Sequence, residues 1–400
     1  MTVGIIGGGA SGMAAALAAA ENPDVQVVLF ERQARVGKKL LATGNGRCNL
    51  SNLHATEGGY HGEDAAFAVP AIQKLPPEAT LQWFRSLGLY TVAEPSGRVY
   101  PWSDQANSVV DVLRLAMEKE NITVHTSWEV KNIRRKDDGF VVDDKFCDKL
   151  IIACGGLAGT RLGGSLSGYK LLSKFGHKST KLRPALVQIK CNWHGSAALK
   201  GVRAECHVKI LKDGALFKAG RGEIQFTEIG LSGPVMFELS RDICAETGAW
   251  IAELDLLPTY TPDALLTELT RRKETNLTAE DLLTGILHNR LGRVLVKSVG
   301  IKGNTFVKEL TAEELQEVCR MVKSCQITLT EPLDMGAAQV TAGGVLTKDF
   351  DPETMESKLV PGLYACGEVL DIDGDCGGYN LQWAWSSGRI AGLHAGKEAK

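Results

Sequence analysis

The sequence predicts an α/β protein built on a parallel β-sheet, and three observations lead to this prediction. Thr2–Ile6 is a short apolar run of the kind that forms a buried strand. A glycine-rich turn and a helix-forming stretch from Ser11 to about Asn22 follow it. Residues 25–31 (VQVVLFE) then form a second strand, so that the first 31 residues make a β-α-β unit of ordinary size.

The middle of the chain changes in character. Residues 121–156 contain short strand-like pieces split by an Asp-Asp-Gly turn, which predicts a small meander that returns to the parallel sheet. Residues 184–258 combine alternating polarity with frequent glycines, a pattern typical of antiparallel strands. We therefore expect a first α/β segment over residues 1–183 and an inserted β subdomain over residues 184–258.

The next segment, residues 259–325, has helical patterns. Thr311 and Glu314 have the spacing of a capping box at a helix start, and Thr278 with Asp281 is a weaker version of it. Residues 326–400 return to strand patterns and end in a helix predicted from Tyr379 to about Gly392. The sequence thus predicts a split α/β domain that closes over residues 326–400, with a helical subdomain before it.

Composition restricts the class of protein. Four hundred residues exceed one compact core, and 44% hydrophobic with 23% charged residues is typical of a globular protein. The formal net charge of −2 predicts no nucleic-acid partner and no acidic membrane. The ten cysteines form no C-x-x-C pair, which indicates reduced thiols and a cytoplasmic location. Neither a secretion signal nor an 18-residue apolar run is present, so we expect no membrane span.

The glycine-rich turn has the spacing of a dinucleotide site. Gly7, Gly9 and Gly12 fit G-x-G-x-x-G between a strand and a helix, where they allow a tight turn, a close approach of pyrophosphate and close helix packing. Glu31 ends the second strand 19 residues beyond Gly12, where its carboxylate can accept ribose hydroxyl bonds. Glu31 would repel a 2′-phosphate, although the adjacent Arg32 weakens this discrimination. The turn therefore favours FAD or NAD over NADP.

Other glycine clusters favour FAD. The chain has no second G-x-G-x-x-G in a β-α-β context. Residues 150–156 (LIIACGG) and 363–368 (LYACGE) are strands that end in glycine, and in flavoproteins of the glutathione-reductase kind such ends approach the adenine side and the ribityl chain. Glu368 can bond a ribityl hydroxyl there. The helix that follows Gly377-Gly378 can direct its amides toward the flavin pyrimidine edge.

Longer motifs resemble one known family. Residues 37–49 (GKKLLATGNGRCN), 340–345 (VTAGGV) and 367–392 (GEVLDIDGDCGGYNLQWAWSSGRIAG) closely resemble the BaiN-type flavoproteins, also known as aminoacetone oxidase family FAD-binding enzymes. The resemblance covers nearly the whole chain, including GRVYPWSDQA, RPALVQI and GLSGP. It implies a split FAD-binding Rossmann domain of glutathione-reductase type, with an inserted antiparallel β-barrel-like subdomain and a small helical subdomain.

The resemblance also implies the residues of an FAD site. Those carried over by motif are Gly7, Gly9, Ser11, Gly12, Glu31, Arg32, Lys39, Leu40, Asn45, Gly46, Arg47, Cys48, Asn49, Gly155, Glu368, Asp373, Asn380 and Leu381. Val130 joins them by its place in the meander, where a contact to adenine is expected. One loop, residues 163–169 (GGSLSGY), departs from the more usual G-S-T-G-D-G-Y pattern of the family.

Catalytic residues are less clearly indicated. Reduction of a carbon–carbon bond needs a proton donor besides the flavin, and Tyr60, Tyr100 and Tyr379 are candidates, although tyrosines more often complete a packing surface. Cys48 is a candidate redox thiol, but it lacks a partner cysteine nearby in the sequence.

Two further features have plain structural interpretations. His177 follows a predicted helix and is expected to be a cap or surface histidine. The acidic residues Asp371, Asp373 and Asp375 lack the spacing of an EF-hand, so we predict no metal site.

Within the resembled family, two activities are implied for a small-molecule substrate. One is reduction of a conjugated double bond in a 3-oxo-Δ4 or Δ6 steroid of bile-acid metabolism, with NADH or NADPH as the candidate reductant. The other is oxidation of aminoacetone by oxygen. The apolar segments RPALVQI and GLSGP carry no carboxylate and favour the steroid. A flavin-bound RNA-modifying or regulatory protein is a third alternative, for which the near-neutral charge offers no support.

Overall fold

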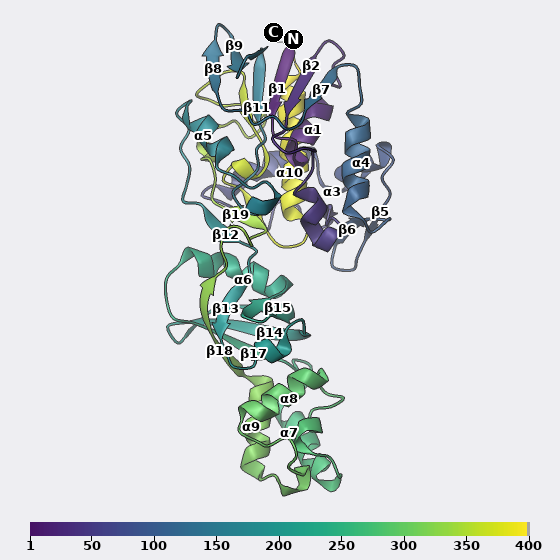
Figure 1. Cartoon of the computed structure of the whole chain (residues 1–400), viewed down its shortest axis with the longest axis vertical. Helices are drawn as coiled ribbons and strands as arrows, with labels where there is room; N and C mark the ends of the chain where they lie inside the picture. The colour runs from purple at the N-terminus through teal and green to yellow at the C-terminus, as the bar shows by residue number, and fades with distance from the viewer. Residues whose placement is uncertain (398–400) are drawn as a thin grey trace. The chain divides into compact units, whose positions relative to one another are not determined.

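The computed structural model describes residues 1–397, which form two compact units (Figure 1). The first unit comprises residues 1–184 and the chain from Met335 onward. The second unit comprises residues 185–334. The chain therefore leaves the first unit once and returns to it, as the split domain predicted from the sequence requires.

The first unit is built on a five-stranded sheet with the strand order β20-β11-β1-β2-β7 and parallel pairing throughout. Its strands are β1 (Thr2–Ile6), β2 (Gln26–Phe30), β7 (Ile122–His125), β11 (Lys149–Ile152) and β20 (Leu363–Ala365). The central strands are apolar without alternation because helices and loops cover both faces, and β1 and β11 are buried along nearly their whole length. The Rossmann-type α/β fold predicted from the sequence is confirmed.

Smaller sheets complete the first unit. The predicted meander is present as β10-β9-β8, and it returns the chain to the parallel sheet at β11. The strands of these sheets are β3 (Ser51–Asn52), β4 (Tyr60–His61), β5 (Thr91–Ala93), β6 (Arg98–Pro101), β8 (Ile133–Lys136), β9 (Gly139–Val142), β10 (Lys145–Cys147), β12 (Arg183–Ala185), β19 (Val340–Ala342) and β21 (Asp373–Gly374). The pairing of β4 with β21 is antiparallel, and it joins segments more than 300 residues apart.

Two helices of the first unit run side by side in the same direction. These are α1 (Ala10–Ala19) and α10 (Tyr379–Ala395), which lie against each other in Figure 1. A β-carbon added at Gly388 would overlap the carbonyl of Ser11, and one added at Gly392 would overlap that of Ala15. Both helices advance by four residues between these contacts, so they are parallel and packed backbone to backbone. The other helices of this unit are α2 (Val69–Lys74), α3 (Pro77–Ser86), α4 (Ala106–Ala116) and α5 (Ser167–Ser173).

The second unit contains a closed antiparallel barrel with the strand order β13-β16-β15-β14-β17-β18. Its elements are β13 (Ile189–Asn192), β14 (Arg203–Lys212), β15 (Ala215–Phe226), β16 (Gly230–Ser232), α6 (Pro234–Ala245), β17 (Trp250–Asp255), α7 (Pro262–Arg271), α8 (Asn289–Ser298), α9 (Ala312–Lys323) and β18 (Cys325–Pro332). The predicted barrel-like insertion and helical segment are both present, and they belong to one compact unit.

The structure corrects one boundary and adds one helix. Residues 326–400 were expected in the FAD-binding domain, whereas β18 pairs with β13 and β17 and closes the barrel. Its alternating burial pattern predicts a strand but does not tell which sheet the strand joins. The helix α6 was also not expected within residues 184–258, because the alternating polarity and frequent glycines of this segment indicate strands and turns.

The two predicted helix starts have different outcomes. Thr311 and Glu314 form a capping box, in which the Thr311 hydroxyl accepts the Glu314 N–H at 3.1 Å and the Glu314 carboxylate accepts the Thr311 N–H at 2.8 Å. Thr278 makes no side-chain cap, and only a 3₁₀ turn over Ala279–Asp281 follows it. The carboxylate of Asp281 instead accepts a bond from Arg293 at 3.2 Å.

His177 is buried rather than a surface histidine as expected, with 3% of its surface exposed. One ring nitrogen, Nε2, lies 3.0 Å from the hydroxyl of Ser357, and the ring stacks on Phe350 with 4.5 Å between centroids. The other nitrogen, Nδ1, is buried without a hydrogen-bond partner. Burial lowers the pKa of His177, because a charged imidazole would lose its hydration.

This histidine predicts a stability that falls in mild acid. Because the pKa of His177 is lower in the folded than in the unfolded chain, the unfolded chain binds more protons below about pH 6.5. The free energy of unfolding therefore keeps its full value above that pH. It decreases as the pH falls toward the pKa of His177 in the folded chain, by at most about 1.4 kcal/mol per pH unit. Denaturant unfolding at about pH 7.5 and 5.5 measures the loss. His177→Gln retains a donor for Ser357 and is expected to lose less stability than the wild type over this pH range. His207→Gln is the control at an exposed site. An equal loss of stability in the wild type and both variants would contradict this explanation.

Candidate functional site

The turn between β1 and α1 provides no side-chain cap for the first amides of α1. Gly7 has φ +110°, and a β-carbon at Gly12 would overlap the Gly7 carbonyl, so this turn and the first helical residues are in direct backbone contact. Gly9 is the N-cap residue and provides no side-chain cap. A β-carbon at Gly9 would meet no atom within 4 Å. The amides and the positive dipole end of α1 therefore face open space, which is the arrangement that binds pyrophosphate.

Glu31 is held next to this turn at the end of β2. Its Oε2 accepts the N–H of Gly8 at 2.7 Å, and its Oε1 accepts the N–H of Gln33 at 2.7 Å. The side chain of the next residue, Arg32, donates to the carbonyl of Gly163 at 2.5 Å. The structure thus places the predicted ribose-binding carboxylate in a fixed position beside the helix N-terminus, with lone pairs that can still accept further bonds.

A charged pair connects distant segments at the carboxyl ends of β11 and β20. The Lys39 ammonium lies 2.8 Å from Oε2 of Glu368, and Oε1 of Glu368 accepts the N–H of Thr341 at 2.9 Å. Gly155, which follows β11, has φ +69°, and a β-carbon there would meet no atom within 4 Å. Ligands of open parallel sheets bind at this edge, so these residues lie where a dinucleotide is expected.

The segment GNGRCN has an unusual backbone. Asn45, Gly46 and Cys48 all have positive φ, at 57°, 86° and 61°. A β-carbon at Gly46 would meet no atom within 4 Å, and the Oδ1 atom of Asn49 is buried without a partner. Left-handed conformations at non-glycine residues are strained and cluster at binding sites, so this segment is a second place where a ligand can replace missing contacts.

Arg47 extends from this segment over a tyrosine. Its guanidinium lies 4.0 Å from the ring centroid of Tyr100, and it is ion-paired with Asp104 and, at 3.4 Å, with Glu94. These acidic partners raise the pKa of Arg47, mainly through the hydrogen bond to Asp104. Arg47 was predicted to bind the cofactor or the substrate, and in the structure its charge is already balanced by two carboxylates.

The N-terminus of α10 is fixed by side chains from two sides. Gly377 and Gly378 have positive φ, and Gly378 is an N-cap residue without a side-chain cap. The Asn380 side chain accepts the N–H of Gly374 at 2.8 Å and donates to the Gly374 carbonyl at 2.7 Å. Asn52 donates to the carbonyl of Gly377 at 2.8 Å. Asn380 and Asn52 therefore hold the N-terminus of α10 in position, and its N-cap glycine provides no side-chain cap.

The two helix N-termini are offset along one direction. Because Gly388 lies against Ser11 and the helices are parallel, α10 begins nine residues before this contact. At 1.5 Å per residue, its N-terminus extends about 13 Å beyond that level. One elongated dinucleotide can therefore meet the amides of α1 with its pyrophosphate and those of α10 with its ring.

The space and the polar atoms at this site fit FAD. Gly9, Gly46 and Gly155 each border open space, and the Asn49 Oδ1 atom is buried without a hydrogen-bond partner. An extended cofactor with pyrophosphate, ribityl hydroxyls and a polar ring edge supplies groups of the kind this atom lacks.

The remaining predicted FAD residues lie around the same segments. Leu40 and Val130 are buried, and Leu381 is partly buried near the start of α10. Asp373 is buried in β21, where it pairs with His61 of β4. Their roles as FAD contacts stay predictions.

The candidate catalytic residues are less accessible. Burial raises the pKa of the Cys48 thiol to about 12, and the side chain is fully buried, which offers no support for a redox thiolate. The Tyr379 hydroxyl donates to the carbonyl of His54 at 3.2 Å. Tyr100 is buried beneath Arg47, and burial also raises the pKa of its phenol.

Sequence reasoning missed one pair of side chains near these residues. A ring nitrogen of His61 lies 2.7 Å from a carboxylate oxygen of Asp375. His61 belongs to no recognisable motif, and Asp375 was noted only as one of three neighbouring acids. The pairing of β4 with β21 brings them together, and nothing in the local sequence predicts that pairing.

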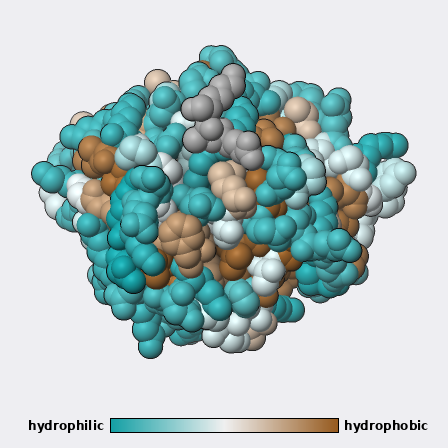
Figure 2. All heavy atoms as spheres, turned by 90° about the horizontal axis from the view of Figure 1, so that it is seen from above, coloured by the Kyte–Doolittle hydropathy of each residue, from teal (hydrophilic) through white to brown (hydrophobic). Residues whose placement is uncertain are grey.

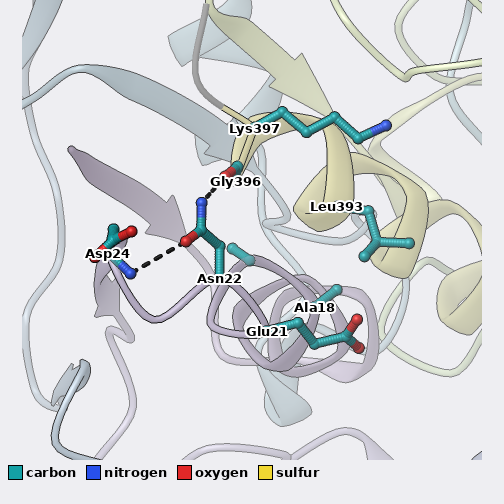
Figure 3. A pocket seen from close by; sticks show the side chains of 8 residues that line it. Ala18, Glu21, Asn22, Asp24, Leu393, Gly396 and Lys397 are labelled. Carbon is teal, nitrogen blue, oxygen red and sulfur yellow. Dashed lines mark hydrogen bonds between the residues drawn. The ribbon is translucent and has the colours of Figure 1, made fainter.

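A groove lies at the opposite end of α1 from the glycine turn. It is lined by Ala18, Ala19, Glu21, Asn22, Asp24, Leu393, Gly396 and Lys397 (Figure 3). Asn22 donates to the carbonyl of Gly396 at 3.0 Å, which ties the ends of α1 and α10 together. The view onto this end of the first unit shows hydrophobic atoms among hydrophilic ones (Figure 2).

The described residues contain neither a metal-binding cluster nor a membrane-spanning helix. Within residues 1–397, no group of three or more His, Cys, Asp or Glu side chains is placed to hold a metal ion. No helix formed by the same residues is long and apolar enough to cross a membrane.

The fold and the site together define a Rossmann-type FAD-dependent oxidoreductase. The chain belongs to the family described as HI0933-like protein Rossmann domain, whose sequence model matches residues 1–394. This result confirms the flavoprotein family predicted from the motifs.

Known proteins are similar over almost the full length. The chain is 38% identical to 3-dehydro-bile acid delta(4,6)-reductase of Clostridium scindens, over 98% of each chain. It is 32% identical to ribosomal RNA dihydrouridine synthase of Escherichia coli, over 96% of this chain and 95% of that protein. A solved structure of 3-ketosteroid delta1-dehydrogenase from Sterolibacterium denitrificans is 13% identical, with 99% of each chain covered and a TM-score of 0.50. That last likeness shows a shared fold.

Proposed function

We propose that the protein reduces a carbon–carbon double bond conjugated to a carbonyl group, and that its substrate is a 3-oxo-Δ4 or Δ6 steroid of bile-acid type. The observation that carries this proposal is the 38% identity, over 98% of both chains, with 3-dehydro-bile acid delta(4,6)-reductase. The likeness spans nearly the whole chain and therefore includes both compact units.

The second relative supports the same reaction class. Dihydrouridine is uridine in which the ring double bond conjugated to a carbonyl has been reduced. The names of both relatives therefore describe addition of two hydrogens to an activated double bond. The two substrates differ greatly in size and charge, so the reaction class has broader support than the steroid.

The described residues have definite roles in this reaction. Bound reduced FAD supplies a hydride at N5 of its ring. The amides of α1 and the carboxylate of Glu31 would hold the adenosine diphosphate half of FAD, and the Lys39–Glu368 pair would bind its ribityl chain. The amides at the N-terminus of α10 would stabilise negative charge on the reduced ring.

Uridine in ribosomal RNA is the second candidate substrate, and the 32% identity with the Escherichia coli protein favours it. RNA binding would require an uninterrupted basic surface. Basic side chains on the barrel strands and the adjoining loops are instead ion-paired with acids, in the pairs Lys200–Glu228, Lys209–Glu253, Lys212–Glu246 and Lys218–Asp242. These pairs cancel much of the local positive charge, which supports the steroid over RNA.

A reoxidation experiment tests the proposal. The purified yellow protein is reduced without oxygen, first with NADH or NADPH and separately with dithionite, and then mixed with a 3-oxo-Δ4,6 steroid. We expect the flavin absorbance to return only when steroid is present, with a product that has one double bond fewer by mass spectrometry. If the reduced protein instead forms dihydrouridine in ribosomal RNA and does not react with the steroid, the substrate is uridine and not the steroid. Oxidation of aminoacetone in air with formation of peroxide would overturn the reductase.

A further inference from the structure

The proposed reduction needs a proton donor, for which the sequence suggests Tyr60, Tyr100 and Tyr379. When a hydride from reduced FAD adds to the β-carbon of the enone, the π electrons of the double bond move onto the α-carbon and the carbonyl oxygen. The α-carbon then takes up one proton, which completes the addition of two electrons and two hydrogens. A protein side chain near the ring end of the site would accelerate this proton transfer as a general acid.

His61 and Asp375 lie at that end of the site. His61 is in β4, opposite Asp373 of β21, and Asp375 follows β21 directly. Asp375 stands three residues before the N-cap residue Gly378 of α10. The offset between α1 and α10 places this N-terminus at the ring end of an extended dinucleotide, and the His61–Asp375 pair adjoins it.

The pair has the geometry of an oriented acid. The 2.7 Å bond to Asp375 uses one ring nitrogen of His61 and leaves the other for a second partner. The His61 and Asp375 side chains are 34% and 41% exposed, so the imidazole can reach a bound substrate and regain its proton from water. Histidine carries its charge change near neutral pH, and a carboxylate partner fixes its tautomer and stabilises the imidazolium.

The tyrosines near this end are less suited to the task. Tyr379 donates its hydroxyl proton to the His54 carbonyl, and the Tyr60 hydroxyl lies 3.5 Å from the carbonyl of Tyr379. Tyr100 is covered by Arg47. Each of these phenols is therefore occupied or enclosed, whereas His61 is both paired with an acid and accessible.

We propose that His61, oriented by Asp375, donates the proton to the α-carbon of the enone substrate. This inference rests on the proposed reduction. The ring nitrogen that does not face Asp375 gives up its N–H proton to carbon, and the N–H···carboxylate bond persists. The imidazole that results is neutral, and solvent returns its proton before the next turnover.

The test separates proton donation from binding of FAD. His61→Gln and Asp375→Asn are reduced anaerobically with dithionite and mixed with a 3-oxo-Δ4,6 steroid in stopped flow. We expect His61→Gln to reoxidise at least about 100-fold more slowly, and Asp375→Asn less severely, while both retain wild-type FAD content and visible spectrum. His54→Gln is the matched control, since His54 lies in the loop just before β4 and its ring faces Gly97, and it is expected to react at the wild-type rate.

The pH dependence gives a second readout. Wild-type reoxidation should slow as the pH rises, because a general acid must carry the proton that it donates, and this dependence should be absent in His61→Gln. Asp375, which is bonded to the imidazole, and the neighbouring titratable side chains of Tyr60, Tyr379, Glu63 and Asp371 stay unchanged in that comparison. In His61→Ala, added imidazole should restore part of the rate, and this variant also serves if His61→Gln fails to fold.

The outcomes are distinguishable. If the reduced wild-type protein is not reoxidised by the steroid, the proposed function is wrong and this role for His61 fails with it. If the wild type reacts but His61→Gln and His61→Ala match its rate and pH profile, the inference alone is overturned. A slow His61→Gln that has also lost FAD, with no rescue by imidazole, would assign His61 a structural role and overturn it as well.

Discussion

Gly9→Val is expected to fold like the wild type and to lose at least about 100-fold in affinity for FAD, or about 3 kcal/mol. The backbone of Gly9 is extended, at φ −81° and ψ −167°, so a valine can adopt it. A β-carbon there would meet no protein atom within 4 Å. The added methyl groups instead fill the space in front of the first amides of α1, where the pyrophosphate is expected. Titration of the apoprotein with FAD, followed by flavin fluorescence, measures the loss.

Two variants of the same turn are the controls. Gly9→Ala adds less volume and is expected to bind FAD with intermediate affinity. Gly12→Ala should behave in the opposite way, because its β-carbon would overlap the carbonyl of Gly7 and destabilise the fold itself. If Gly9→Val binds FAD as tightly as the wild type, the pyrophosphate does not lie at the N-terminus of α1.

The dinucleotide turn could be predicted because its determinants are local. The strand, the three glycines, the helix and Glu31 all lie within 31 residues, and the spacing of G-x-G-x-x-G has a direct steric meaning. The structure adds a contact that spacing does not reveal, the bond from the Gly8 amide to the carboxylate of Glu31. This bond explains how the carboxylate keeps one orientation beside the turn.

Contacts between distant segments could not be predicted in the same way. Lys39 and Glu368 are 329 residues apart, and His61 and Asp375 are 314 residues apart. Each pair is brought together by the return of the chain to the first unit after the inserted barrel. A motif can suggest that Lys39 and Glu368 both approach FAD, but only the pairing of strands from both halves shows that their charges meet.

The errors of the sequence analysis have a common physical cause. An amphipathic pattern predicts a strand at Cys325–Pro332 but contains no information about its neighbours, so β18 was placed in the wrong unit. His177 is polar and follows a helix, which suggested exposure, whereas Ser357 and Phe350 from a distant segment enclose it. In both cases partners far away in the sequence decide the environment of the residue.

Gly392→Leu is expected to destabilise the first unit by about 3 kcal/mol or more. A β-carbon at this position would already overlap the backbone carbonyl of Ala15, and backbone atoms cannot move aside as a flexible side chain can. A leucine would therefore force α10 away from α1. Denaturant unfolding, followed by tryptophan fluorescence, is a suitable measurement because Trp383 and Trp385 of α10 are buried in this unit.

Leu393→Met is the matched control on the same turn of α10, since Leu393 is partly exposed and a volume-conserving change there should cost little.

The packing of α1 against α10 also sets how far the two N-termini are offset, so a partial loss of contact should weaken FAD binding before it abolishes folding. Gly392→Ala, the smallest possible addition, tests this coupling. We expect it to bind FAD less tightly than Leu393→Met does at temperatures where both remain folded. If both Gly392 variants keep wild-type stability and FAD affinity, the two helices can move apart without cost. A fixed offset between the N-termini of α1 and α10 could then no longer explain how one cofactor meets both helix ends.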